Sequence, residues 1–181
     1  MGTKRFFLSG LAMLILLCSF APPAWIQFQN KTGRFKATFP GKPEVSAQDV
    51  NTEIGPLKMN MFMFTGTDEK DENKIYGIAY ADYPAKLINS GMPASTLDTF
   101  FANAIEGSAR NMNGEVIEEE KIALKTFPGR QVKIRFSDGE AIMKLRIFLV
   151  KNRAYFLEVG YETKNDGNPT INKFFSSFAL L

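Results

Sequence analysis

The stretch that decides the fold is "GRQVKIRFSDGEAIMKLRIFLVKNRAYFLEVGYE", residues 129–162, which contains three strand patterns separated by two short turns. Asp138 and Gly139 form a dipeptide typical of a two-residue hairpin turn, and such a turn sets which residues of the flanking strands lie opposite one another. The resulting pairs are Val132 with Leu145, Ile134 with Met143, and Phe136 with Ala141. Since every pair is apolar, the turn and the hydrophobic pattern predict the same register and the same buried face.

The second turn of this stretch lies at residues 151–153, where the sequence predicts a three-residue loop. This loop pairs Leu149 with Tyr155, Ile147 with Leu157, Leu145 with Val159, and Arg146 with Glu158. Both hairpins then bury the same face, and Glu158 lies beside Arg146 on the other face. We therefore expect three strands that form an antiparallel meander.

The part of the chain before this stretch shows further strand patterns. The segment "WIQFQNKTGRFKATFPGKP", residues 25–43, reads as two short strands joined by a polar turn, and "IYGIAYADY", residues 75–83, reads as another strand. Between them, "LKMNMFMF", residues 57–64, alternates with period two, which is the signature of a strand.

Two helices are expected. In "STLDTFFANAIEGSARNMNG", residues 95–114, apolar residues recur at three- and four-residue steps, with Ser95 as the N-cap and Gly114 as the stop. The segment "NPTINKFFSSF", residues 168–178, starts with Asn168 as its cap and a proline in the first turn. The order of elements predicts an α+β fold. We expect a single antiparallel sheet of about six to seven strands, ending in the meander and packed with one long central helix and one C-terminal helix.

The N-terminal residues 1–24 have the order of a secretory signal peptide. A basic pair, Lys4 and Arg5, precedes an apolar run, and two prolines follow. The run is shorter than the roughly 20 apolar residues that a transmembrane helix needs, so removal of the signal is expected to leave no transmembrane segment. We therefore expect an exported protein, periplasmic or extracellular, with residues 25–181 as its single domain. The alternative is a lipoprotein signal in which Cys18 is acylated and anchors the protein to a membrane surface.

The composition excludes several classes of catalysis. The chain has no histidine and one cysteine, Cys18, which falls within the signal segment. Ser-His-Asp and Cys-His catalysis, cysteine redox chemistry and the usual zinc sites are therefore excluded, and we expect no cofactor. After the signal, 20 basic residues face 19 acidic ones, a balance that argues against nucleic-acid binding.

Carboxylates are the groups that remain for catalysis, and their densest cluster is "EEEK", residues 118–121. A hydrolase that works with carboxylates alone, such as Glu118 or Asp138, stays an alternative. A charge run of this kind is more typical of a solvated strand edge. We therefore predict no catalytic residue and no enzyme activity.

Met59, Met61 and Met63 share one face of the predicted strand with Leu57. Thioether sulfur suits Cu(I), so a small-ligand or Cu(I) carrier that uses these methionines, in a pocket between helix and sheet, is a second alternative. Their alternation within a strand favours core packing instead, because methionine is an adaptable filler of cores. We therefore predict no metal site.

Four basic side chains gather on one face of the first hairpin: Lys133, Arg135, Lys144 and Arg146, called the basic row below. The predicted register places Lys133 beside Lys144, with the two arginines one step diagonal to them. Stacked cations attract an acidic partner, although a solvated sheet face also carries such residues. The basic row is our candidate for partner binding.

Both ends of the chain after residue 24 resemble those of the PsbP-like class of small exported bacterial proteins. The stretches concerned are "WIQFQNKTGRFKATFPGKP", of the form W-x-x-F-x-x-x-x-G-x-F-x-x-x-F-P-x-x-P, and the closing "FFSSFAL". Photosystem II PsbP proteins, and a structurally similar import factor that binds the Ran GTPase, share an antiparallel sheet with helices packed against it. The resemblance implies the same fold here, but the histidine-based metal sites of PsbP proteins have no counterpart in a chain without histidine.

Characterised members of that class are largely accessory and binding proteins rather than enzymes. The resemblance, together with the composition, predicts a non-catalytic binding or accessory domain, exported to the bacterial cell envelope, that acts through a protein partner. The small-ligand or Cu(I) carrier and the carboxylate-dependent hydrolase are the alternatives.

Overall fold

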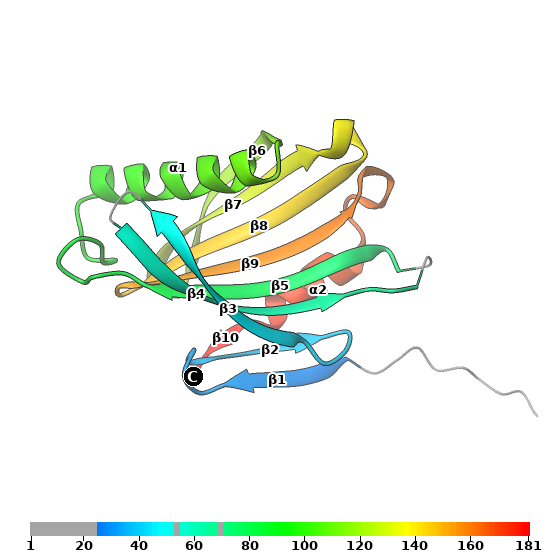
Figure 1. The fold of residues 1–181 in the computed structure, drawn as a ribbon, viewed down its shortest axis with the longest axis horizontal. Helices are drawn as coiled ribbons and strands as arrows, with labels where there is room; N and C mark the ends of the chain where they lie inside the picture. Colours follow the sequence, from blue (N-terminus) through cyan, green and yellow to red (C-terminus); the bar gives the residue numbers. More distant parts are fainter. Residues whose placement is uncertain (1–24, 53–54, 69–70) are drawn as a thin grey trace, which may run out of the picture.

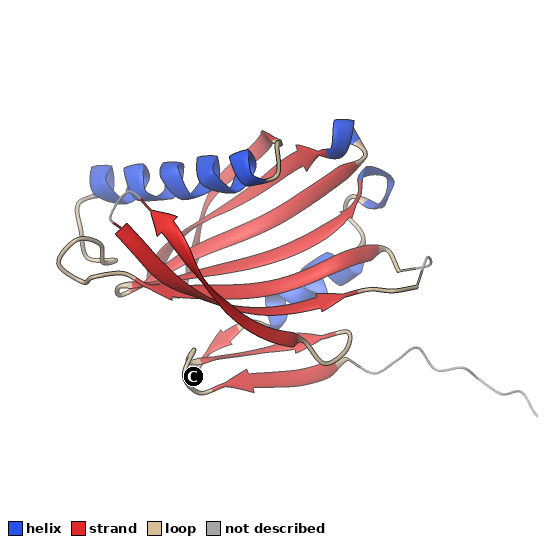
Figure 2. Cartoon of the chain, viewed as in Figure 1, coloured by secondary structure: helices blue, strands red, loops and turns tan. Residues whose placement is uncertain are grey.

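The structure is a computed structural model that describes residues 25–52, 55–68 and 71–181. The predicted signal peptide, residues 1–24, and its Cys18 lie outside the described residues. Two antiparallel sheets and two α-helices make up the described part of the chain (Figure 1 and Figure 2). Within these ranges, no helix is both long enough and apolar enough to cross a membrane.

Ten strands lie within the described ranges. They are β1 (Ile26–Asn30), β2 (Phe35–Phe39), β3 (Glu44–Thr52), β4 (Gly55–Thr65), β5 (Asn73–Asp82), β6 (Glu115–Leu124), β7 (Phe127–Phe136), β8 (Ala141–Val150), β9 (Arg153–Glu162) and β10 (Ala179–Leu180). The helices are α1 (Ala94–Asn111) and α2 (Pro169–Ser177), and short 3-10 turns follow β7 and β9, at Ser137–Gly139 and Thr163–Asn165.

The large sheet has seven strands in the order β3-β4-β5-β9-β8-β7-β6, and the small sheet has three in the order β1-β2-β10. The predicted α+β class, the meander and both helices are confirmed. The first two strands, however, do not join the large sheet. Instead, β2 pairs with β1 on one side and on the other with β10, the last strand in the described part of the chain. The small sheet is therefore completed by the segment that follows α2.

The hairpin between β7 and β8 has the predicted register. Its pairs include Val132 with Leu145, Ile134 with Met143, and Phe136 with Ala141. Asp138 and Gly139 adopt positive φ values of 54° and 94°, and the Glu140 N–H donates to the Ser137 carbonyl at 3.0 Å. Positive φ at both central residues matches the twist of the flanking strands, which is why this dipeptide predicts the turn.

The hairpin between β8 and β9 differs from the prediction by one residue. The turn contains two residues, Lys151 and Asn152, so Val150 pairs with Arg153. Arg153 stays in the strand because its guanidinium donates to both carboxylate oxygens of Asp82 on the neighbouring β5, at 2.7 and 2.6 Å. A bidentate, charge-assisted pair of this kind fixes the position of the arginine.

The one-residue shift moves the side chains of β9 to the opposite faces. Leu145 lies opposite Glu158, and Arg146 lies opposite Leu157. The pairs predicted for this hairpin, such as Leu145 with Val159 and Arg146 with Glu158, are therefore wrong, and so is the single core face. Both faces of the large sheet are buried, one beneath α1 and the other beneath α2 and the small sheet (Figure 1).

Helix α1 lies over the part of the large sheet that contains β7 and β8 (Figure 1). It begins after Pro93 rather than at the predicted Ser95 cap, and it ends shortly before Gly114, the predicted stop. Asn113 takes the positive φ, 48°, that ends the helix, and the Gly114 N–H donates to the Ala109 carbonyl at 2.9 Å.

Helix α2 packs on the opposite face, next to the small sheet. Asn168 caps it as predicted, because its side-chain oxygen accepts from the backbone N–H groups of Thr170 and Ile171 at 3.2 and 3.4 Å. The cap is also tied to β5, since the Asn73 amide donates to the Asn168 oxygen at 3.1 Å and to the Thr170 hydroxyl at 2.6 Å. These contacts hold α2 in place and set the position of Phe175 beside β8.

Candidate functional site

The structure brings the four residues of the basic row together on the face of the large sheet that carries α2. Lys133 pairs directly with Lys144, Arg146 lies opposite Gln131, and Arg135 lies one step further along β7. This grouping depends on the first hairpin alone, which explains why the sequence predicts it. The surroundings divide the four cations into two kinds.

Lys133 and Arg135 already have carboxylate partners. The Lys133 amine lies 3.0 Å from a Glu118 oxygen and 2.8 Å from an Asp166 oxygen, and only 14% of its side chain is exposed. Burial acts to lower the pKa of Lys133, but its hydrogen bonds to Asp166 and Glu118 together raise it above its ordinary value. Arg135 contacts Glu115 at 2.8 Å near the surface.

Lys144 is the first cation without such a partner. No carboxylate oxygen of the described residues lies within 4.0 Å of its amine, and the side chain is half-buried. Burial lowers the pKa of Lys144 below its ordinary value, and the charges of Lys133 and Arg146 lower it further. Asp166 and Glu118 compensate this only in part, and no carboxylate contacts the ammonium directly, as one usually does for a buried charge.

Arg146 is the second cation of the basic row without a carboxylate partner. Its Nε donates to the Gln131 side-chain oxygen at 2.8 Å, and its guanidinium carbon lies 4.6 Å from the centre of the Phe175 ring on α2. Burial lowers the pKa of Arg146, and the part of the chain that the structure describes offers no carboxylate within 4.0 Å of the guanidinium. The arginine is therefore held between strand and helix with no carboxylate in direct contact, and the more distant charge of Glu120 opposes the effect of burial only in part.

The predicted neutralisation of Arg146 by Glu158 is wrong because the two side chains lie on opposite faces of the sheet. On the α1 face, a Glu158 oxygen and the Met63 sulfur each lie 2.6 Å from the position that a Cβ would take at Gly77. The absence of a side chain at Gly77 thus makes room for both groups. Burial raises the pKa of the Glu158 carboxyl above its ordinary value.

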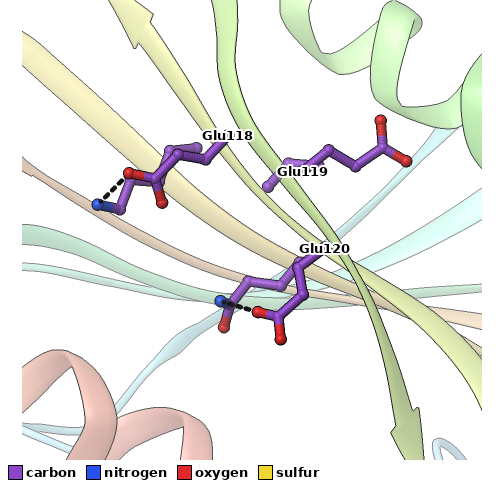
Figure 3. Close-up of a pocket in the computed structure, with 6 residues that line it drawn as sticks. Glu118, Glu119 and Glu120 are labelled. Atoms are coloured by element: carbon purple, nitrogen blue, oxygen red, sulfur yellow. Dashed lines mark hydrogen bonds and ion pairs between the residues drawn. The ribbon is translucent and has the colours of Figure 1, made fainter.

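The acidic run on β6 does not form a paired-carboxylate site. Figure 3 shows Glu118 and Glu120 on one side of the strand and Glu119 on the other. Glu118 contacts Lys133 at 3.0 Å, Glu120 accepts from the Gln131 amide at 3.3 Å, and Glu119 contacts Arg130 at 3.3 Å. Each carboxylate is therefore bound by a different donor.

The pocket beside this run is small, and Asp138 is not among the residues that line it. Its volume is about 240 Å³, below the roughly 300–1,000 Å³ of typical small-molecule sites. Asp138, the other residue proposed for a hydrolase, lies in the turn between β7 and β8, whereas Glu118 lies opposite Lys133 on β6. The structure does not bring the two predicted acids together.

Met59, Met61 and Met63 lie on one face of β4, as predicted, but none of the three is among the buried core residues. Phe62, on the other face, is only 2% exposed and packs beneath the small sheet, while the three methionines are half-buried. The prediction of core packing is therefore wrong. Among the described residues, no group of three His, Cys, Asp or Glu side chains is arranged to hold a metal ion, and the thioethers remain the candidate Cu(I) ligands.

Three residues of the site were missed by sequence reasoning. Gln131 continues the alternation of Lys133 and Arg135 along β7, so the period-two pattern contains the signal for it. Asp166 and Phe175 come from the turn and the helix after β9, and no local pattern connects them with β7 or β8.

The fold defines a class before any comparison is made: an antiparallel α+β domain with helices on opposite faces of its large sheet. The structure is similar to the solution structure of cyanobacterial PsbP (CyanoP) from Synechocystis sp. PCC 6803, with a TM-score of 0.53 and 7% sequence identity. The match covers 90% of this chain and 96% of that one. The PsbP resemblance is therefore confirmed as a resemblance of fold.

Neither the family models nor the curated proteins contain a match to the chain. Identity of 7% carries no information on which residues act. The residues of this chain, above all the basic row, therefore carry the information on function.

Proposed function

We propose that the protein is an exported, non-catalytic accessory domain of the bacterial cell envelope that acts by binding a protein partner through the basic row. The observation that supports this most directly is the pair of half-buried cations, Lys144 and Arg146, without a carboxylate partner among the described residues. Two such charges are unfavourable in the isolated domain and become favourable when an acidic group binds them.

The composition and the acids of β6 support a role without catalysis. The chain has no histidine, and its one cysteine, Cys18, falls in the predicted signal. The carboxylates of the acidic run on β6 are bound by Lys133, Arg130 and Gln131, which hold them in structural contacts.

Export is supported by the basic pair and apolar run of residues 1–24. The mass of the protein isolated from cells tests this step. Loss of the N-terminal segment indicates a cleaved signal, an added acyl mass at Cys18 indicates a lipoprotein, and an unprocessed chain contradicts export by this route.

Affinity purification tests the partner. The full-length protein carries a tag at its C-terminus, where Leu181 is 53% exposed, and is purified from the envelope fraction of its own cells after mild crosslinking. We expect a reproducible, stoichiometric partner in mass spectrometry. A protein that is recovered alone at native abundance contradicts the proposal.

A second candidate function, a Cu(I) carrier, is favoured by one observation: Met59, Met61 and Met63 lie on one strand face and are only half-buried, and thioether sulfur suits Cu(I). Cu(I) titration of the parent and of Met61→Leu tests it. Stoichiometric binding that weakens in the variant supports a carrier, whereas no binding by the parent, or equal binding by both, removes it.

A further inference from the structure

We propose that Lys144 and Arg146 together bind one carboxylate group of the protein partner, either an acidic side chain or a chain's C-terminal carboxylate. This inference rests on the proposed function and names the chemistry that the site recognises. Of the four cations in the basic row, Lys133 and Arg135 hold Asp166, Glu118 and Glu115, so the other two are the ones that remain for a ligand.

Arg146 is preorganised for this role. Its Nε donates a hydrogen bond of 2.8 Å to the side-chain oxygen of Gln131, and the centre of the Phe175 ring lies 4.6 Å from its guanidinium carbon. Its two terminal nitrogens have no hydrogen-bond partner among the described residues. Two parallel N–H groups match the two oxygens of a carboxylate, and little side-chain freedom is lost when a held arginine binds.

Lys144 adds the second charge. It lies on the same strand face as Arg146, two residues away, and directly opposite Lys133. A carboxylate bound between the amine and the guanidinium relieves the repulsion among the three cations and gives Lys144 the direct ion-pair partner that it does not have among the described residues.

The acids around Lys144 and Arg146 indicate which kind of ligand fits the pair: a single carboxylate group or an extended anionic surface. Glu115, Glu118, Glu120 and Asp166 contact the cations or the glutamine of this face, so its four positive charges are matched by four negative ones. A flat anionic membrane that approaches the face meets these acids as well as the cations and gains little. One projecting carboxylate can contact Lys144 and Arg146 without facing all four acids.

The test is binding of three probes to the purified protein, followed by NMR: a hexaglutamate peptide, inorganic phosphate, and phosphatidylglycerol vesicles. We expect saturable binding of the peptide, with shifts at the backbone amides around Lys144 and Arg146. Lys144→Met and Arg146→Gln should each weaken the peptide affinity by about tenfold or more, because each removes one of the two positive charges that contact the bound carboxylate. Arg135→Gln is the matched control, since it removes a charge of the same face that is already paired, and it should leave the affinity unchanged.

Several outcomes overturn the inference. They are no peptide binding by the parent, binding by both charge-removing variants that is as tight as that of the parent, a loss of affinity in Arg135→Gln as large as in those variants, or tighter binding of phosphate or vesicles than of the peptide. If Arg146→Gln does not fold, because the contact with Phe175 is lost, Lys144→Met alone decides.

The proposed function and this inference fail in different ways. The function fails if the parent recovers no partner from the envelope. The inference fails if the parent recovers a partner and Lys144→Met recovers the same partner in equal amount.

Discussion

Replacing Lys144 by methionine should stabilise the fold at pH 7, although it removes a charge from a sheet face. Lys144 lies directly opposite Lys133 and two residues from Arg146, and within the described ranges no carboxylate oxygen lies within 4.0 Å of its amine. Like charges that face each other across an antiparallel pair destabilise it by about 0.2–1 kcal/mol. Methionine is an unbranched side chain only one atom shorter than lysine, and it removes both the repulsion and the burial of a charge.

Attraction to Asp166 and Glu118 offsets part of this repulsion. We therefore expect the free energy of unfolding to rise by about 0.5–1 kcal/mol in Lys144→Met at pH 7. A gain in stability on losing the residue is the pattern expected of a side chain kept for binding rather than for folding.

The gain should depend on pH in a defined direction. Burial, Lys133 and Arg146 hold the pKa of Lys144 in the folded protein below that of the unfolded chain. Between the two pKa values the unfolded state binds more protons, so the stability of the parent rises with pH in that interval. The variant has no amine to titrate, and its advantage is therefore greatest below the folded pKa and shrinks as the pH approaches the unfolded value of about 10.4.

Urea denaturation of the parent and the variant at pH 7 and pH 10 measures this effect. Trp25, the one tryptophan of the chain, packs edge-on against Tyr76 with ring centroids 5.5 Å apart, so its fluorescence reports unfolding. Arg135→Gln, the paired and exposed control, should change the stability by less than about 0.5 kcal/mol. A Lys144→Met variant that is less stable than the parent at pH 7, or whose advantage is the same at pH 10, refutes the reasoning.

Three further predictions concern stability. Glu158→Gln should stabilise the fold by about 1 kcal/mol at pH 7, because burial raises the pKa of the Glu158 carboxyl and the parent loses stability as the pH rises through that folded pKa. Denaturation of the parent and the variant at pH 4 and pH 8 checks this. A parent whose free energy of unfolding equals that of the variant at both pH values contradicts it. Asn168→Ala should lower the free energy of unfolding by about 1–2 kcal/mol through loss of the α2 cap, whereas an unchanged urea midpoint would mean that the cap contributes nothing. Phe62→Ala should lower it by about 3–5 kcal/mol, well beyond Met61→Ala; similar losses in the two variants would show that the faces of β4 are wrongly assigned.

Much of the local structure is predictable from the sequence because it depends on neighbouring residues. The turn at Asp138 and Gly139 needs only a dipeptide that tolerates positive φ, and the apolar pairs of the two strands then agree with it. The Asn168 cap is equally local, since its oxygen binds N–H groups two and three residues further on. The grouping of the basic row follows from the first turn alone.

The second hairpin shows where local reasoning ends. Residues 151–153 read as a three-residue loop, but Arg153 is drawn into β9 by Asp82, which lies 71 residues earlier in the chain. Because side chains alternate with period two, the one-residue shift places Glu158 and Arg146 on opposite faces of the sheet. The sequence predicts one buried face, whereas both faces of the sheet are buried in the structure.

The sequence by itself determined the class of fold, the first register and the position of four cations on one face. Only the tertiary structure decided which of these cations lack a counter-charge. Asp166 neutralises Lys133 and Phe175 holds Arg146, and both come from segments that follow the hairpin and are folded back onto it by the packing of α2. Charge and periodicity are properties of neighbouring residues, whereas pairing and burial depend on contacts between residues far apart in the chain, and those contacts exist only in the folded protein.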